Sequence, residues 1–173
     1  MGTREVAASG VMAALVCVTT MLITIPIPAT QGFFNIGDAM IMVAALTFGP
    51  IVGGIAGGIG SSLADILGGW YNYAPFTLII KGIEGVLTGY IIARSKKQNL
   101  LVLILAWVVG GLEMVTGYFT AQAFALGYGI AGASVEAPFN FVQMAVGGLV
   151  GIPISLALKT RIHIQRTPEP VKR

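Results

Sequence analysis

The chain has 173 residues, of which 55% are hydrophobic and 10% are charged, and its mean hydropathy is +0.86. A soluble domain of this length could not bury so much apolar surface, so the composition excludes a soluble globular protein and indicates an integral membrane protein. The formal charge of +3 does not indicate nucleic-acid binding, because the basic residues flank apolar segments and lack interleaved aromatic residues.

The first predicted helix covers residues 6–25, within the ~17–25 apolar residues that one crossing of a bilayer needs. Pro26 and Pro28 end it. Because no small-residue cleavage site follows, we interpret it as a retained helix and not as a removed signal peptide. Cys17, the only cysteine, lies in this helix and excludes a disulfide within the chain. A loop over residues 26–36 is expected next.

The following apolar block is broken at Gly49-Pro50, a strong turn signal. We expect a short helix over 38–48, which must be tilted or packed inside the bundle, and a longer one over 51–67. Three more helices are predicted over 76–94, 100–126 and 138–158. The sequence therefore predicts an all-α fold, an integral membrane bundle of six transmembrane helices. It forms one domain, residues 1–160, followed by a basic tail, residues 161–173.

The positions of the basic residues predict the orientation. With six crossings, Arg4, the group at 94–97 and the C-terminal cluster lie on one side, while the opposite loops contain no Lys or Arg. By the positive-inside rule, both termini are then cytoplasmic, in a multi-pass protein of the plasma membrane. A five-helix alternative, with 38–67 as one kinked element, would place these basic groups on opposite sides.

Several charged residues lie within or beside the apolar segments, where each costs at least ~2.5–3.5 kcal/mol. In the predicted topology, Lys81 and Glu84 lie roughly 8 and 12 Å below the outer boundary, and Glu113 is also in the outer half. The remaining polar residues at this level are Asp38, Asp65, Asn140 and Gln143, which lie near the outer ends of their helices. Polar groups from separate helices at one depth indicate a ligand site.

Helical spacing places these groups on three stripes with small residues beside them. The stripes are Lys81, Glu84, Gly85 and Thr88; Glu113, Thr116, Gly117 and Thr120; and Asn140, Gln143, Met144 and Gly147. Three such stripes can surround a cavity. Structural alternatives remain for each: an intrahelical ion pair of Lys81 with Glu84, a protonated Glu113 hydrogen-bonded to a neighbouring helix, or interhelical contacts of Asn140 and Gln143.

Glycines at four-residue spacing, such as Gly53 with Gly57 and Gly85 with Gly89, predict close helix packing. The first helix carries its own small residues in two lines, Ser9 with Ala13 and Gly10 with Ala14. These predict either packing within the monomer or an interface to a partner subunit. No Gly-Lys-Ser or Gly-Lys-Thr occurs in the chain, so it has no recognisable ATPase motif.

Several short motifs, in this order and topology, resemble a known family. They are Ala-Ala-Ser-Gly-Val-Met-Ala-Ala-Leu at 7–15, Asn-Ile-Gly-Asp at 35–38, Ser-Ser-Leu-Ala-Asp at 61–65, Tyr-Ala-Pro-Phe-Thr at 73–77 and Lys-Gly-Ile-Glu-Gly at 81–85. Together they resemble the substrate-binding S components of energy-coupling factor (ECF) vitamin transporters. The similarity is greatest to the subgroup with riboflavin-type and hydroxymethylpyrimidine- or pyridoxine-type S components.

This resemblance implies capture of a water-soluble vitamin or precursor from outside, under a lid formed here by residues 26–36, with Phe34 or Tyr71 available for stacking. The residues predicted to bind the ligand are Phe34, Asn35, Asp38, Asp65, Tyr71, Lys81, Glu84, Glu113, Asn140 and Gln143. The resemblance also implies a membrane scaffold subunit and two cytoplasmic ATPases as partners. Ser9, Gly10, Ala13 and Ala14 are the predicted scaffold contact. No catalytic residue, metal or cofactor is predicted.

Two other classes of function remain open from the residues alone. A self-contained small carrier or channel would fit the glycine ridges, although the two halves show no inverted duplication. An intramembrane enzyme acting on lipids usually needs paired acidic motifs, and the sequence has no Asp-x-x-Asp cluster and no histidine in its apolar segments.

Overall fold

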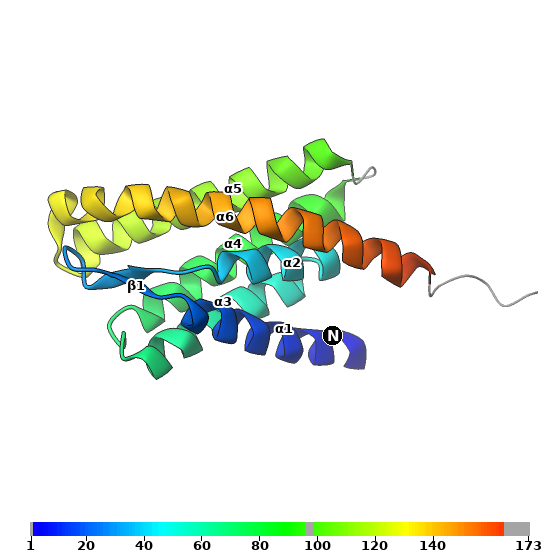
Figure 1. The fold of residues 1–173 in the computed structure, drawn as a ribbon, viewed down its shortest axis with the longest axis horizontal. Helices are drawn as coiled ribbons and strands as arrows, with labels where there is room; N and C mark the ends of the chain where they lie inside the picture. Colours follow the sequence, from blue (N-terminus) through cyan, green and yellow to red (C-terminus); the bar gives the residue numbers. More distant parts are fainter. Residues whose placement is uncertain (1, 96–98, 165–173) are drawn as a thin grey trace, which may run out of the picture.

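The computed structural model describes residues 2–95 and 99–164, and Figure 1 shows them as a bundle of helices with a small hairpin at one end. The helices are α1 (Thr3–Leu22), α2 (Asp38–Phe48), α3 (Pro50–Gly68), α4 (Ala74–Arg94), α5 (Leu100–Thr120), a π-helical turn η1 (Ala121–Ala125) and α6 (Gly129–Ile164). The strands are β1 (Ile25–Ile27) and β2 (Gly32–Phe34). The predicted helical bundle is confirmed.

In the described part of the chain, five helices are long and apolar enough to cross a membrane, namely α1, α3, α4, α5 continued by η1, and α6. Helix α2 has 11 residues and is buried along most of its length, from Asp38 to Leu46. It is therefore packed inside the bundle, one of the two arrangements expected for so short a helix. Large apolar side chains such as Val11, Leu101 and Leu149 are exposed on the outside, as in a protein surrounded by lipid.

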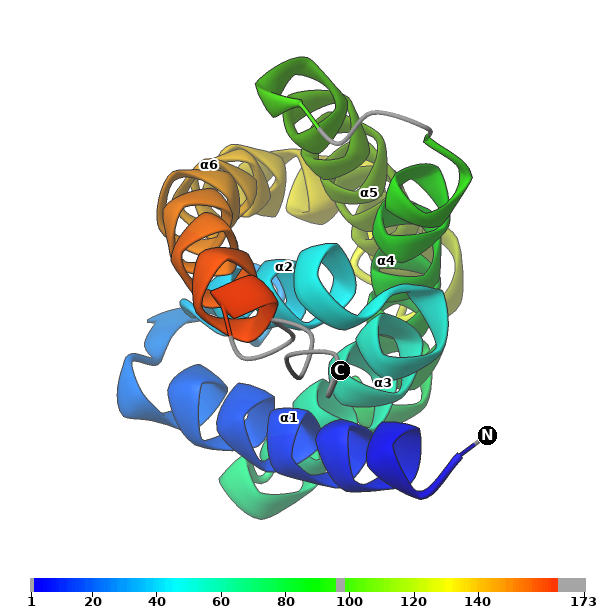
Figure 2. The same cartoon turned by 90° about the vertical axis from the view of Figure 1, so that its right-hand side faces the viewer.

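The start of α1 and the end of α6 lie at the same end of the bundle, together with the turn at Gly49 (Figures 1 and 2). The hairpin and the connections after α3 and after η1 lie at the other end. Exposed Arg4 and Arg94 belong to the first end. This arrangement agrees with an even number of passes. The six spans and the cytoplasmic location of the termini stay predictions.

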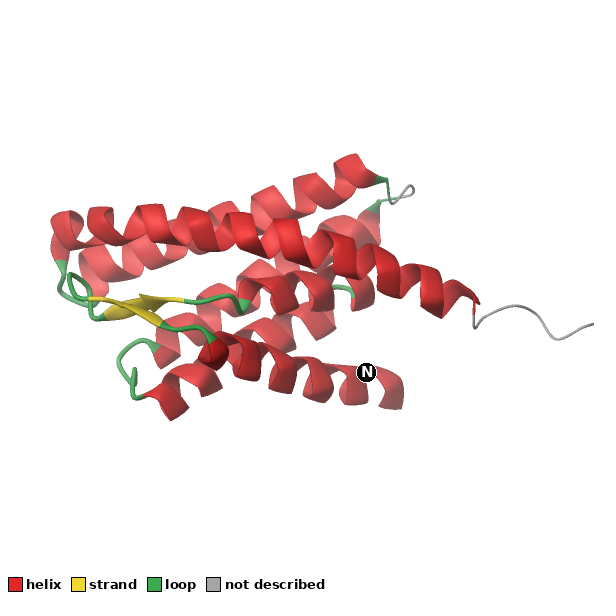
Figure 3. Ribbon diagram, in the orientation of Figure 1, coloured by secondary structure: helices red, strands yellow, loops and turns green. Residues whose placement is uncertain are grey.

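The segment between α1 and α2 was predicted as a loop, but it forms an antiparallel β-hairpin (Figure 3). Ile25 pairs with Phe34, and Ile27 pairs with Gly32. Isoleucine and phenylalanine favour strands, and proline is tolerated in an edge strand because its missing N–H is not needed there. Gln31 at the turn has a φ of 54°, in the left-handed region. The hairpin lies across one end of the bundle.

Helix α6 starts at Gly129, so the prediction that it begins at Pro138 is wrong. Proline often marks a first helical position, but membrane helices also tolerate it internally, where neighbouring groups satisfy the freed carbonyl. The earlier start adds Glu136 to the same helix as Asn140 and Gln143. The predicted basic tail, residues 161–173, lies mostly outside the described residues, which extend as far as Ile164.

Glycines bring α3 and α4 together over much of their length. A Cβ atom on Gly85 would overlap the carbonyl oxygen of Gly53, and one on Gly57 would overlap the carbonyl oxygen of Lys81. Side chains there would force the two backbones apart. This close contact allows Asp65 at the end of α3 and Lys81 on α4 to reach the same space.

Candidate ligand-binding site

Beneath the hairpin, polar side chains surround a small cavity of about 20 Å³. Its walls come from the hairpin, α1, α3, α4, α5 and α6. The lining residues are Thr20, Gly32, Phe33, Asn35, Ser61, Asp65, Tyr73, Thr77, Lys81, Tyr118, Glu136, Asn140 and Gln143. A space of this volume holds about one water molecule. A larger guest therefore needs the hairpin or the lining side chains to move.

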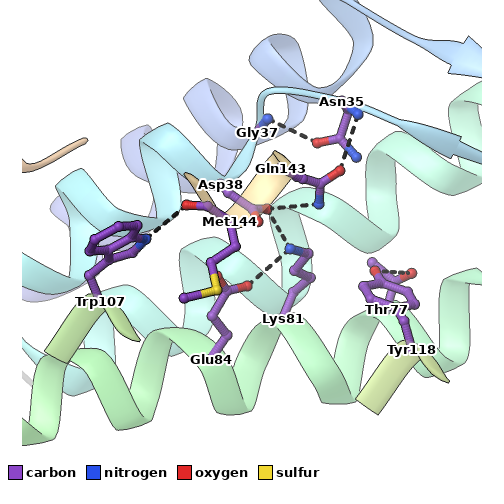
Figure 4. Close-up of polar contacts among 10 residues, drawn as sticks. All are labelled: Asn35, Gly37, Asp38, Thr77, Lys81, Glu84, Trp107, Tyr118, Gln143 and Met144. Atoms are coloured by element: carbon purple, nitrogen blue, oxygen red, sulfur yellow. Dashed lines mark hydrogen bonds and ion pairs between the residues drawn. The ribbon is translucent and has the colours of Figure 1, made fainter. Parts of the chain in front are cut away.

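Lys81 is the only cation in this part of the described structure, and two carboxylates neutralise it (Figure 4). Its Nζ donates to Asp38 Oδ1 from α2 and, at 3.0 Å, to Glu84 Oε2 one turn along α4. The same amine lies 5.7 Å from the centre of the Tyr118 ring. All three charged side chains are buried. The intrahelical pair considered from the sequence therefore exists, as part of a three-residue cluster.

Gln143 connects this cluster to the base of the hairpin (Figure 4). Its Nε2 donates to Asp38 Oδ1 at 3.2 Å, and its Oε1 accepts from the backbone N–H of Asn35 at 3.1 Å. The Asn35 side chain accepts in turn from the N–H of Gly37 at 2.9 Å, at the start of α2. The position of the hairpin is thus coupled to the buried charges.

A second set of hydrogen bonds holds the turn of the hairpin against the helices. The Thr30 hydroxyl donates to Glu136 Oε2 on α6, and the Tyr73 hydroxyl donates to the Thr30 carbonyl at 2.7 Å. Burial, with the Glu136 carboxylate nearby, raises the pKa of the Tyr73 phenol, so it stays a donor at physiological pH. We call Thr30, Tyr73 and Glu136 the hairpin latch.

Alternation along β2 decides which phenylalanine faces the cavity. Successive side chains of a strand point to opposite faces, and Phe33 is the one that lines the cavity. Its ring lies 4.1 Å from that of Trp70. Phe33 and Trp70 also line a neighbouring cavity of about 220 Å³ between the hairpin, α1 and α3. Phe33 and Thr20 line both spaces, so their side chains lie between the small polar cavity and this larger one.

The structure brings together most, but not all, of the residues predicted to bind the ligand. Asn35, Asp65, Lys81, Asn140 and Gln143 line the polar cavity, and Asp38 and Glu84 contact Lys81 directly behind it.

Phe34, Tyr71 and Glu113 are not among the lining residues. Phe34 is on the other face of β2, and Tyr71 is 68% exposed. Glu113 lines a separate, open and mainly apolar groove of about 730 Å³ between α4 and α5.

The predicted stripe on α5 lies on a different face of that helix from the one that borders the polar cavity. The stripe of Glu113, Thr116 and Thr120 faces this outer groove, whereas Met114 and Tyr118 are buried in the bundle. A polar stripe predicts the face of a helix that points into the bundle only where packing contacts on another face of the same helix do not set its rotation. Here close packing is provided by Gly110 and Gly111, whose Cβ positions would overlap Thr88 and Met144.

Sequence reasoning missed six polar residues of the cavity: Thr20, Ser61, Tyr73, Thr77, Tyr118 and Glu136. A signal existed for Glu136, because Glu136, Asn140 and Gln143 follow the i, i+4, i+7 spacing of one helical face. This spacing was overlooked because the helix was predicted to begin at Pro138, after Glu136. Thr77 likewise precedes Lys81 by four residues. Tyr73 and Tyr118 carried no comparable signal, since aromatic residues near a membrane surface are common.

The predicted partner contact on α1 divides into two faces. Ser9 is buried and Ala13 is half-buried on the side that packs against α3, where a Cβ on Gly60 would meet the Ala13 carbonyl. Gly10 and Ala14 are exposed on the opposite side. Of the two predicted lines, the one formed by Gly10 and Ala14 is therefore the one exposed to another subunit.

Within the described residues, no group of three or more histidine, cysteine, aspartate or glutamate side chains is placed to hold a metal ion. The site consists of hydrogen-bonding side chains and buried charges. Such a site can orient a polar guest through paired donors and acceptors, with aromatic rings at its edge.

Comparison with known proteins identifies related sequences over nearly the whole chain. Residues 1–160 match the family model described as ECF-type riboflavin transporter, S component. A protein of Pyrococcus woesei, described as an uncharacterized protein in gap 3'region, is 48% identical over 147 residues, covering 85% of this chain and 96% of that protein.

Two further relatives are more distant. The thiamine precursor transporter HmpT of Lactococcus lactis subsp. cremoris is 36% identical over 135 residues, covering 78% of this chain and 75% of its own. A UPF0397 protein of Streptococcus agalactiae is 26% identical over 119 residues, covering 63% of each chain.

Proposed function

Because the chain belongs to the family of ECF-type riboflavin transporter S components, we propose that it captures a vitamin or vitamin precursor outside the cell and delivers it inward. The family is one of transporter subunits and not of enzymes. The observation that carries the proposal is the polar cavity under the hairpin, where Asp65, Lys81 and Asn140 come together from three helices. Such buried polar groups in a membrane bundle are costly unless they serve a ligand or each other.

The proposed ligand is a flat, polar heterocycle of the riboflavin type or of the hydroxymethylpyrimidine or pyridoxine type. The Lactococcus relative carries the name of a thiamine precursor transporter, which favours the smaller heterocycles. The cavity of about 20 Å³ must enlarge to admit either. Movement of the hairpin with Phe33 would join it to the adjoining space of about 220 Å³.

Energy for release inward would come from partners, since the chain has no Gly-Lys-Ser or Gly-Lys-Thr phosphate loop. We propose a membrane scaffold subunit and two cytoplasmic ATPases. We also propose that residues 1–160 form one transmembrane domain of the plasma membrane with both ends in the cytoplasm, next to the basic residues Arg4 and Arg94.

Mass spectrometry of the small molecule that co-purifies with the detergent-solubilised protein tests the proposed function. A vitamin-like heterocycle is expected. Uptake by the isolated protein in vesicles without nucleotide or partners would instead indicate a self-contained carrier.

Enlarging Gly10 or Ala14 to leucine should leave ligand affinity unchanged and abolish transport by the complete complex. Both residues are exposed on α1, away from the cavity, and small residues allow close helix contact with another subunit. Binding by calorimetry and uptake in cells containing the partners would separate the two effects. Val11→Ala, on the same exposed surface, is the control. Normal uptake by both leucine variants would move the partner surface elsewhere.

Thr30→Val should accelerate ligand dissociation roughly ten-fold or more, because it removes the hydroxyl that donates to Glu136 and holds the hairpin turn. Valine keeps the shape of threonine, so the packing of the turn is retained. Stopped-flow release of the co-purified ligand measures the rate. Thr116→Val, on the outer face of α5, is the matched control. Equal release rates in the two variants would show that the latch does not limit opening.

A further inference from the structure

A larger hollow lies on the outside of the bundle, in the open groove of about 730 Å³ between α4 and α5. We call it the α4–α5 groove. Its polar lining residues are Glu113, Thr116 and Thr120, and the others are apolar or glycine. Ile79 and Phe124, which also line it, are 60% and 74% exposed. The groove is thus an uncovered apolar surface that contains one carboxyl group.

The Glu113 carboxyl has no hydrogen-bonding group to meet in this groove. Its Oε2 atom is buried and without a hydrogen-bond partner among the described residues. The nearby Thr116 hydroxyl donates to the Leu112 carbonyl at 2.7 Å, so its proton is already used. Acidic residues in membrane helices normally face the bundle interior and pair with other polar groups. Glu113 therefore offers an acceptor to a molecule that brings a hydrogen-bond donor.

The depth of Glu113 in the membrane excludes a lipid head group as that donor. At 1.5 Å per residue, Glu113 lies about 20 Å from Leu100 at the start of α5 and about 18 Å from Ala125 at the end of η1. It is therefore near the middle of a hydrocarbon core about 30 Å thick. Head groups lie at the two surfaces, and acyl chains contain no donor. A polar side chain on a transmembrane helix can present one at this depth.

The shape of the α4–α5 groove favours a helix of another protein over a second copy of this chain. Two copies related by a two-fold axis would use the same surface, which places groove against groove and Glu113 against Glu113. A single helix is convex and can lie in a groove. Residues 112–125 extend along this one for about 20 Å, and Gly117 and Thr120 are small enough for a second backbone to approach.

We propose that the α4–α5 groove binds a transmembrane helix of a partner protein, and that this helix carries a hydrogen-bond donor side chain near its middle, opposite Glu113. The surface is separate from the predicted contact on α1, because α1 and α5 lie on opposite sides of the bundle (Figure 2). Helices α4 and α5 also carry Lys81 and Tyr118, which line the polar cavity. A helix in the groove would thus touch two helices that form the cavity wall. This inference goes beyond ligand capture, and its failure would leave the proposed function intact.

The test measures association of the full chain with synthetic transmembrane peptides in phosphatidylcholine vesicles. Each peptide has about 20 leucine and alanine residues, with one asparagine at the centre, one near an end, or none. Energy transfer between labelled protein and labelled peptide gives the relative affinities, at a peptide density too low for the peptides to associate with each other. We expect the central asparagine to strengthen association about three- to ten-fold over the other two peptides. Equal association of all three would overturn the proposal.

Glu113→Leu should remove this preference, whereas Glu113→Gln, which retains an acceptor oxygen, should keep it. A preference that persists in Glu113→Leu would overturn the assignment. Thr120→Phe fills the groove and should weaken association of every peptide. Leu105→Phe, at an exposed position of α5 outside the groove, is its control.

Two other occupants of the α4–α5 groove have distinct signatures in the same variants. Energy transfer between two labelled copies of the protein that is lost in Thr120→Phe and kept in Leu105→Phe would assign the groove to a second copy. A lipid found by native mass spectrometry with the same dependence would assign it to lipid. Either result would overturn the proposal.

Discussion

Lys81→Met should lower the free energy of unfolding by about 3–5 kcal/mol, the typical effect of removing one partner from a buried ion cluster. Lys81 is buried, and its amine is the only cation that contacts Asp38 and Glu84 in the described structure. Methionine fills nearly the same volume but leaves two carboxylates without a cation. Gln143, which bonds to Asp38, would lose its orientation as well, and ligand affinity should fall with stability.

Thermal unfolding of the purified protein, followed by circular dichroism, measures this effect. The control is the triple variant Asp38→Asn, Lys81→Met, Glu84→Gln, in which no unpaired charge remains. It should recover most of the lost stability, because the loss arises from uncompensated charge and not from packing. A melting temperature of Lys81→Met equal to that of the original protein would show that the cluster does not stabilise the fold.

Gly85→Ala should also be strongly destabilising, at the upper end of the ~1–3 kcal/mol typical of overpacking. The added Cβ would overlap backbone atoms of Gly53, which cannot move aside as a flexible side chain can. Helices α3 and α4 would separate, and the distance between Asp65 and Lys81 would change. Ligand affinity should therefore decrease together with the melting temperature.

Gly82→Ala, one turn earlier on α4, is the matched control for this prediction. A Cβ there would lie 3.7 Å from its nearest neighbour, the Gly54 carbonyl oxygen, which is ordinary contact. Since alanine favours helix over glycine by up to ~1 kcal/mol, this variant should be neutral or slightly more stable. Equal losses in the two variants would mean that the close approach at Gly53 is not what matters.

The helical segments could be predicted because apolar length and strong breakers are local properties. Helix α2 begins and ends where the Asp38 start and the Gly49-Pro50 turn predicted. The start of α6 was misplaced at Pro138 because the local sequence does not distinguish a proline at a helix start from a proline inside a membrane helix. The hairpin was missed because its strands have three residues each, too few for a period of two to be seen.

The depth of the site residues along the helices could be predicted from the sequence. The direction in which their side chains point could be predicted less well. Asp65, Lys81 and Asn140 were expected at one level and line one cavity. Phe34 was named where Phe33 faces the cavity, since the phase of a strand depends on its pairing. Glu113 was expected inside because its stripe is polar, yet α5 turns this stripe outward.

The amino-acid sequence by itself determined that this is a membrane bundle with costly polar residues at one level, because hydropathy and charge are properties of each segment alone. Only the tertiary structure decided which of those residues meet, that Asp38 and Glu84 share Lys81, and that Oδ2 of Asp65 and Nδ2 of Asn140 are left without partners among the described residues. The physical reason is that the rotation of each helix about its own axis is set by contacts between helices, such as that of Gly53 with Gly85. Those contacts join residues far apart in the chain, and no local pattern specifies them.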